Sequence, residues 1–226
     1  MNRYDLAVFD LDGTLLDTSE GVLAAVEYTI SVSRLKSLEP EKLKQFIGPP
    51  IQESFASAYG LHGEILQELA TVFRNRYKEA ELLKAVPYPG IYKVFDYLSE
   101  HGIKTSVATY KREDYALRIL KHFGFNQYSD ILYGADHENK LKKLDIIQKC
   151  IDDSGISDYS KVVMIGDTSH DALGAKQLGV DFIGVTYGFE FRTEEDVDLY
   201  PNIGKAGCAE ELIRFFETQK GGRHED

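Results

Sequence analysis

Two carboxylates stand one residue apart directly after an apolar run, in the segment 10–14, DLDGT. The run 6–9, LAVF, has the composition of a buried strand, and residues i and i+2 of an extended chain point to the same side. We therefore expect Asp10 and Asp12 to face one pocket just beyond the strand. Neighbouring buried carboxylates repel, so they need a shared proton or a divalent cation, and oxygen-only ligands favour magnesium. A solvated turn is the competing interpretation, because turns favour Asp and Gly.

A second acidic site follows the apolar run 162–165. Gly166 ends this run, and Asp167 and Asp171 follow it with a spacing of four, which would put them on neighbouring turns of one face if a helix began at Asp167. Asp is common at helix starts, so this site alone would be a structural signal. Acidic residues that follow two different strands favour one shared metal site, since ligands bind at the carboxyl edge of parallel sheets.

Strand and helix patterns alternate through most of the chain. The expected strands are 6–9, 105–108, 162–165 and 182–185, with a weaker one at 131–133, and helical patterns lie between them at 91–98, 115–120 and 144–151. Such alternation predicts an α/β fold, a Rossmann-like parallel sheet covered by helices on both faces.

The region 17–84 is different, because it shows helical patterns and no convincing strand. We predict a catalytic core formed by 1–16 and 85–226 and a small helical domain formed by 17–84. Plausible hinges lie at 15–18 and at 86–90, where prolines disfavour a continuing helix.

Composition and charge narrow the possible partners. The 226 residues carry a formal net charge of −11 without a basic cluster, so nucleic acid is an unfavourable partner. Cys150 and Cys208 lack disulfide or zinc-site spacing, and we expect both to be buried, reduced thiols. No apolar run approaches the roughly 18 residues that span a bilayer. We expect a soluble, cytoplasmic protein without a membrane partner.

Four ordered motifs resemble those of the haloacid dehalogenase superfamily. They are DLDGT at 10–14, a Thr at the end of a middle strand (Thr109), lysines before a helix at 140–143, and GDTSHD at 166–171. The helical insertion is similar to the small cap domain of the phosphoglycolate phosphatase-like branch. This resemblance covers nearly the whole chain, and it implies a phosphoric monoester hydrolase that forms an aspartyl-phosphate.

The resemblance also implies roles for individual residues. Asp10 would attack phosphorus, and Asp12 would be the general acid and base. Mg²⁺ would be bound by the side chains of Asp10 and Asp167 and by the backbone carbonyl of Asp12. Thr109 would donate its hydroxyl to the phosphoryl group. Asp171 would orient the water or the lysine.

The lysine and the substrate loop are less defined by the motifs. The segment 140–143 lacks the family's usual proline, so we select Lys143, two residues before Asp145, and keep Lys140 as the alternative; at most one lysine of the run, Lys142 included, should matter. His170 is interpreted as a helix-start residue.

Gly48, Pro49 and Pro50 resemble a cap loop that closes over the substrate, although this triplet is also an ordinary stop between helices. A small cap leaves limited room, so we expect a small phosphorylated metabolite.

Other functions remain to be weighed. An inorganic pyrophosphatase or a sugar phosphomutase of the same superfamily would share the motifs, whereas a dehalogenase proper lacks the second aspartate. A receiver-type signalling domain also joins acidic residues, Thr and Lys on a parallel sheet, but it would be about half this length and would lack the helical insertion. A catalytically idle binding protein would have one acidic motif broken, and both are intact.

Overall fold

A parallel sheet forms the centre of the computed structural model, which describes residues 2–136 and 140–217. Its six strands have the order β5-β4-β1-β6-β7-β8 and pair in parallel. They are β1 (Leu6–Phe9), β4 (Lys104–Arg112), β5 (Leu132–Ala135), β6 (Val162–Gly166), β7 (Asp181–Val185) and β8 (Gly204–Ala206). The predicted α/β fold class is confirmed.

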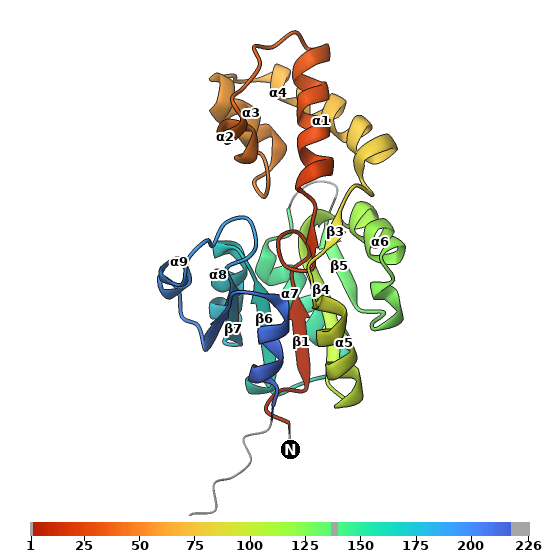
Figure 1. Cartoon of the computed structure of the whole chain (residues 1–226), viewed down its shortest axis with the longest axis vertical. Helices are drawn as coiled ribbons and strands as arrows, with labels where there is room; N and C mark the ends of the chain where they lie inside the picture. The colour runs from red at the N-terminus through yellow and green to blue at the C-terminus, as the bar shows by residue number, and fades with distance from the viewer. Residues whose placement is uncertain (1, 137–139, 218–226) are drawn as a thin grey trace, which may run out of the picture.

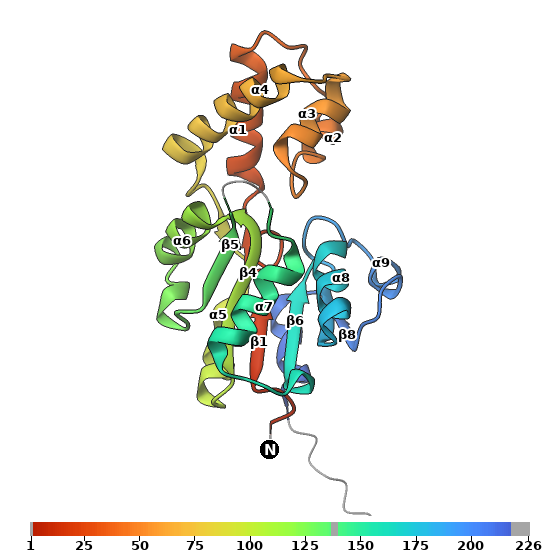
Figure 2. The ribbon, with the colours of Figure 1, turned by 180° about the vertical axis from the view of Figure 1, so that it is seen from behind.

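Helices cover both faces of this sheet (Figures 1 and 2). One face packs against α5 (Ile91–Glu100), α6 (Glu113–His122) and η4 (Ala209–Phe215), with η2 (Phe125–Gln127) beside them. The other face packs against α7 (Lys143–Ser154), α8 (Ser169–Leu178) and α9 (Glu194–Asp198), and η3 (Tyr159–Lys161) precedes β6. The strand β1 is fully buried because its side chains alternate between these two apolar layers.

A block of helices follows β1 and stands above the carboxyl end of the sheet (Figure 1). It contains α1 (Ser19–Val32), α2 (Pro40–Lys44), α3 (Ile51–Tyr59), α4 (Glu64–Arg76) and the π-helical turn η1 (Tyr77–Glu81). Its own small core includes Val26, Phe46, Phe55 and Leu69, with the rings of Phe46 and Phe55 edge to face at 5.0 Å. This helical block therefore packs around an apolar cluster separate from the two layers of the sheet.

A short antiparallel ribbon joins the helical block to the sheet domain. It pairs β2 (Leu16–Asp17) with β3 (Val86–Pro87), so the two connections run side by side. The sequence pattern missed this ribbon because two-residue strands leave no periodicity to detect. Asp17, assigned by sequence to a strand-free region, lies in it.

Three other features differ from the sequence-based expectations. Cys150 is buried, but Cys208 is exposed, because it lies in the turn between β8 and η4. The strand β8 was not expected, since its three residues, Gly-Lys-Ala, include a charged one and none that is β-branched. The strand β4 continues past residue 108 to Arg112. Within the described residues, no helix is long and apolar enough to cross a membrane.

Candidate active site

Asp10 leaves β1 at the carboxyl edge of the sheet, between two other strand ends. Phe9 pairs with Val107 of β4 and with Ile165 of β6, so the chain beyond Asp10 lies beside Thr109 on one side and Asp167 on the other. The Asp10 N–H donates to the Ile165 carbonyl at 2.9 Å, and the residue is 5% exposed. Parallel pairing thus brings residues from three distant motifs to one buried point.

The turn after Asp10 needs glycine. Gly13 has a φ of +83°, and a Cβ there would lie 2.2 Å from Oδ2 of Asp167. Both the left-handed conformation and the close approach exclude a side chain. The next residue, Thr14, donates its hydroxyl to Oδ1 of Asp167 at 3.2 Å. The first motif therefore packs directly on the last acidic motif.

Lys143 bridges two of the buried carboxylates. Its Nζ lies 2.5 Å from Oδ1 of Asp10 and 2.6 Å from Oδ1 of Asp171, and the residue is 3% exposed. Burial lowers the pKa of the ammonium, but Asp10 and Asp171 outweigh burial, and the net pKa of Lys143 is raised. Lys143 is therefore charged at neutral pH. Of the two lysines weighed from the sequence, Lys140 is exposed, and its N–H donates to Asp136 at 2.8 Å.

The position of Lys143 follows from the start of α7. Lys143 is the first residue of this helix, and its free N–H donates to the hydroxyl of Tyr110 at 2.8 Å. The Lys142 N–H donates to Asp145 at 2.8 Å. These contacts satisfy N–H groups that lack partners in the first turn of a helix, and they hold the base of the Lys143 side chain beside β4.

Asp167 and Asp171 differ in their surroundings. Asp167 precedes α8, which begins at Ser169, so the expected helix face shared by the two acids does not form. Instead Thr168 and Asp171 make a reciprocal capping box, and Asp171 accepts the Thr168 hydroxyl at 2.7 Å. Asp167 accepts from the Phe189 N–H at 2.6 Å. His170 lies within α8, and its ring meets that of Tyr110 edge to face at 5.0 Å.

The buried carboxylates outnumber the cation beside them. Oxygen atoms of Asp10, Asp167 and Asp171 lie within 4.8 Å of one another, and Lys143 is the ammonium that pairs with two of them. Burial and the negative charge of Asp171 raise the pKa of Asp10, whereas the ammonium of Lys143 lowers it; the net effect is a pKa raised to about 7. Burial, Asp10 and Asp171 raise the pKa of Asp167 well above its ordinary range. This excess of negative charge on an all-oxygen donor set fits a divalent metal ion.

The side chain of Asp12 contacts other groups than this cluster. Its Oδ1 accepts the Thr18 hydroxyl at 2.5 Å and lies 3.0 Å from Nζ of Lys111, and its side chain is 20% exposed. Lys111, which the sequence interpretation missed, also donates to the Tyr77 hydroxyl at 2.9 Å. Its position two residues after Thr109 on an extended strand was the signal that could have found it, because i and i+2 share a face.

Thr109 lies on β4 next to these groups. It is 1% exposed, and its Oγ1 accepts the Lys111 N–H at 3.1 Å. A hydroxyl that accepts this bond keeps its own proton to donate. The geometry therefore leaves Thr109 able to donate to an oxygen beyond the strand end.

The loop 48–50 lies in the helical block, above the sheet domain. A Cβ at Gly48 would meet no atom within 4 Å, and the three residues are exposed. The preceding Ile47 lines a cleft between the helical block and the loop 187–192 of the sheet domain. The loop thus begins at this cleft rather than at the carboxylate cluster.

Comparisons with known proteins agree with this arrangement. A family model described as haloacid dehalogenase-like hydrolase matches residues 7–185. A 5′-nucleotidase of Pseudomonas aeruginosa is 35% identical over 190 residues, which cover 83% of this chain and 85% of the relative. A phosphoglycolate phosphatase of Agrobacterium fabrum is 31% identical, with 81% of each chain covered. The solved structure of a haloacid dehalogenase-like hydrolase from Streptococcus pneumoniae superposes with a TM-score of 0.87 at 27% identity, over 95% of this chain and 99% of that one.

Proposed function

The chain belongs to the haloacid dehalogenase-like hydrolases and is a phosphatase of that family, and we propose that it hydrolyses a small phosphomonoester in a magnesium-dependent reaction through an aspartyl-phosphate. The observation that carries this proposal is the buried Asp10 carboxylate, held by the Lys143 ammonium at 2.5 Å within a cluster of acids. We also propose that 1–16 and 85–226 form the catalytic core and that 17–84 form a cap domain.

Asp10 is the proposed nucleophile. One carboxylate oxygen forms a bond to phosphorus as the bond from phosphorus to the substrate oxygen breaks. Asp12 gives its proton to this leaving oxygen. In the second half, Asp12 takes a proton from water, the water oxygen bonds to phosphorus, and the Asp10 carboxylate leaves. The net reaction consumes one water and yields an alcohol and inorganic phosphate.

Neighbouring groups stabilise the charge and the geometry of these steps. Lys143 offsets negative charge on Asp10 and on the phosphoryl oxygens. Thr109 donates its hydroxyl to one of these oxygens. Asp171 holds the ammonium of Lys143 from the other side, at 2.6 Å. Phosphoryl transfer depends mainly on such positioning and charge neutralisation.

A magnesium ion fits the acidic edge of the site. The side chains of Asp10 and Asp167 and the carbonyl of Asp12 would bind it, while Asp171 is engaged by Lys143. When bound, the metal supplies positive charge that reduces repulsion between the anionic nucleophile and the phosphate. Burial beside Asp10 and Asp171, which raises the pKa of Asp167 well above its ordinary range, supports this assignment because a bound cation would relieve the crowding of carboxylates.

The substrate is proposed to be a small metabolite, in line with the similarity of this chain to a phosphoglycolate phosphatase. The loop Gly48-Pro49-Pro50 would form part of the wall that closes over it. An inorganic pyrophosphatase and a sugar phosphomutase are the alternatives within the superfamily. A receiver-type signalling domain would keep its phosphate on the aspartate instead of releasing it.

Phosphate release tests this proposal. The panel comprises phosphoglycolate, pyrophosphate, sugar phosphates, nucleoside monophosphates and p-nitrophenyl phosphate, each with and without Mg²⁺, with Asp10→Asn as the control. We expect release that requires both Mg²⁺ and Asp10. A lasting label from acetyl phosphate on a protein that releases no phosphate would contradict the phosphatase proposal and favour a signalling role.

A further inference from the structure

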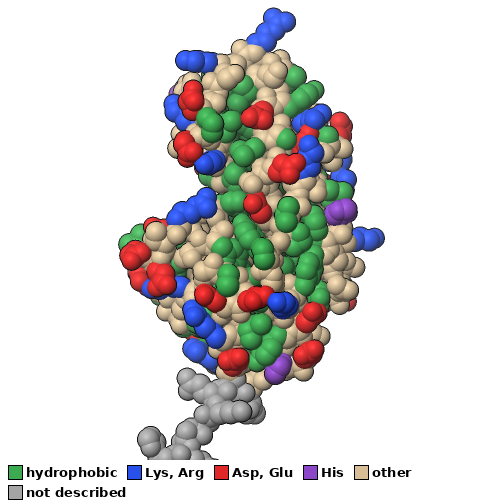
Figure 3. Space-filling view, viewed as in Figure 1, with side chains coloured by type: hydrophobic (Ala, Val, Ile, Leu, Met, Phe, Trp, Pro, Cys, Tyr) green, Lys and Arg blue, Asp and Glu red, His purple; other side chains and the backbone are tan. Residues whose placement is uncertain are grey.

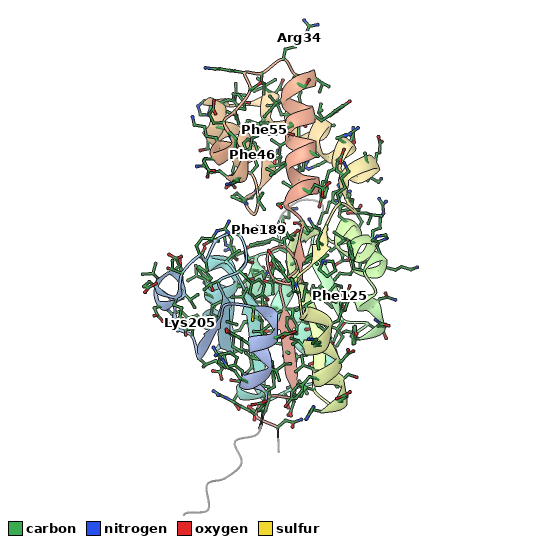
Figure 4. The ribbon with its side chains drawn as sticks, viewed as in Figure 1. Arg34, Phe46, Phe55, Phe125, Phe189 and Lys205 are labelled. Carbon is green, nitrogen blue, oxygen red and sulfur yellow. The ribbon has the colours of Figure 1, made fainter. Side chains whose placement is uncertain are left out.

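A cleft of about 250 Å³ separates the helical block from the sheet domain. The space-filling view shows the hollow between the two parts, and Phe189 lies at the top of the sheet domain facing the helical block (Figures 3 and 4). The residues that line this cleft come from both parts, among them Lys44 and Ile47 of the helical block and Tyr88, Tyr187, Phe189 and Arg192 of the sheet domain. Its volume is just below the roughly 300–1,000 Å³ of drug-sized ligand sites, so it suits one part of a small metabolite.

The cleft adjoins the proposed catalytic groups. The backbone of Phe189 donates to Oδ2 of Asp167 at 2.6 Å, and the hydroxyl of Tyr187 donates to the Thr14 carbonyl at 3.1 Å. On the other side, Asp17 and Ser19 flank Thr18, whose hydroxyl binds Asp12. A leaving group released beside Asp12 therefore has this cleft as its neighbouring space.

Aromatic rings dominate the floor of the cleft on the sheet-domain side. The rings of Tyr88 and Tyr187 lie 4.7 Å apart at an interplanar angle of 58°, and Phe189 lines the same space. Burial, with the charges of Asp17 and Asp167, raises the pKa of Tyr88, so its hydroxyl stays neutral and can donate a hydrogen bond. Such a wall favours a planar, polar-edged group over an aliphatic acid.

Two cations line the cleft from opposite sides. Lys44, on the helical block, already pairs with Glu41 at 2.8 Å. Arg192, on the sheet domain, makes no ion pair within residues 2–136 and 140–217, and its side chain remains available to a ligand. A guanidinium donates in a planar fork to paired acceptors such as the carbonyl and ring nitrogen of a nucleobase.

From these contacts we propose that the cleft binds the nucleoside of a nucleoside 5′-monophosphate, with the base against Phe189 and the tyrosine rings and with Arg192 at its polar edge. This assignment rests on the proposed phosphatase activity, because it names the leaving group of that reaction. The sequence similarity to a 5′-nucleotidase is consistent with it.

The test compares nucleoside 5′-monophosphates with ribose 5-phosphate, which carries the same phosphoryl group and sugar but no base. We expect kcat/KM to favour the nucleotide on the order of tenfold or more, as expected for base stacking on an aromatic side chain. Phe189→Leu keeps apolar bulk without the ring and should bring the ratio toward one, whereas Phe189→Tyr should preserve it. Arg192→Gln should lower the ratio for bases with paired acceptors.

The outcomes separate the two proposals. If phosphate is released but wild type shows no preference for the nucleotide, or Phe189→Leu leaves the ratio unchanged, the nucleoside assignment is wrong and the phosphatase proposal stands. Calorimetric binding to Asp10→Asn in the presence of Mg²⁺ provides a measurement that needs no turnover. Tighter binding of the nucleotide than of ribose 5-phosphate supports the assignment if this difference is lost in Asp10→Asn/Phe189→Leu. This holds even if wild type releases no phosphate, a result that would overturn the phosphatase proposal alone.

Discussion

Nζ of Lys111 lies 3.0 Å from Oδ1 of Asp12. The same ammonium donates to the hydroxyl of Tyr77, in η1 of the helical block, at 2.9 Å. Burial lowers the pKa of Lys111, but Asp12 and Tyr77 outweigh burial and raise the net pKa, so the group is charged at neutral pH. One buried cation thus connects the proposed general acid to the helical block.

Lys111→Met should lower kcat by misplacing Asp12. General acid–base catalysis contributes about 10²–10⁴-fold, and losing only the orientation of the acid should cost about the lower figure. The loss should be larger for an alkyl phosphate than for p-nitrophenyl phosphate, because a good leaving group needs less protonation. Lys121→Met, an exposed lysine on α6, is the matched control. Equal losses of kcat on both substrates would contradict a role for Lys111 in positioning Asp12 to protonate the leaving group.

Lys143→Met should remove activity and destabilise the protein. It deletes one partner of a buried ion pair and leaves Asp10 and Asp171 close together without their cation, which costs about 3–5 kcal/mol. Urea unfolding at neutral pH without metal measures this change in the free energy of unfolding. Lys142→Met, at the exposed neighbouring lysine, should change neither stability nor kcat substantially. Retained activity in Lys143→Met would transfer the proposed role to Lys140.

Tyr110→Phe tests how Lys143 is positioned. The variant keeps the ring but removes the hydroxyl that accepts the Lys143 N–H at 2.8 Å. A hydrogen bond of this kind contributes about 0.5–1.5 kcal/mol net, so we expect a several-fold fall in kcat with little change in KM. The control is Tyr133→Phe on the neighbouring strand β5, which removes a hydroxyl bonded to the exposed Asp153 of α7. A rise in KM with an unchanged kcat would assign Tyr110 to substrate binding instead.

Much of the fold could be predicted from apolar runs. The runs 6–9 and 162–165 became central strands because both faces of the sheet are covered, which gives uninterrupted apolar sequence. Continuation of β4 to Arg112 could not be predicted, because its last residues, Lys111 and Arg112, are charged and interrupt the apolar run. The strand β8 has no pattern of its own and depends on pairing with β7.

The site was predictable only where parallel register dictates it. Asp10 and Asp167 end adjacent strands, so their proximity follows from the motifs and the sheet alone. Choosing between Lys140 and Lys143 requires knowing where α7 begins, which a contact with Tyr110 helps to set. The partnership of Lys111 with Tyr77 needs the placement of the helical block, which sequence spacing does not encode.

Magnesium should stabilise the protein more at pH 7.5 than at pH 5. The folded-state pKa of Asp10 is raised from 3.8 to about 7, and that of Asp167 is also raised. An acid whose pKa is higher in the folded state than in the unfolded state binds its proton more tightly when the protein is folded. Without metal, Asp10 and Asp167 therefore stabilise the folded state at low pH, and this stabilisation is lost as the pH rises from about 4 to 7. A divalent cation competes with those protons and offsets the repulsion once they leave.

The measurement is the shift in Tm caused by Mg²⁺ at each pH. At a concentration of about 100 Kd, binding adds about 2.7 kcal/mol, which for a chain of this size is a shift of several degrees. Asp10→Asn removes one titrating ligand and should flatten the pH dependence, whereas Asp130→Asn, at an exposed aspartate before β5, should preserve it. A shift that is equal at both pH values in wild type would mean that Mg²⁺ does not bind at this acidic cluster.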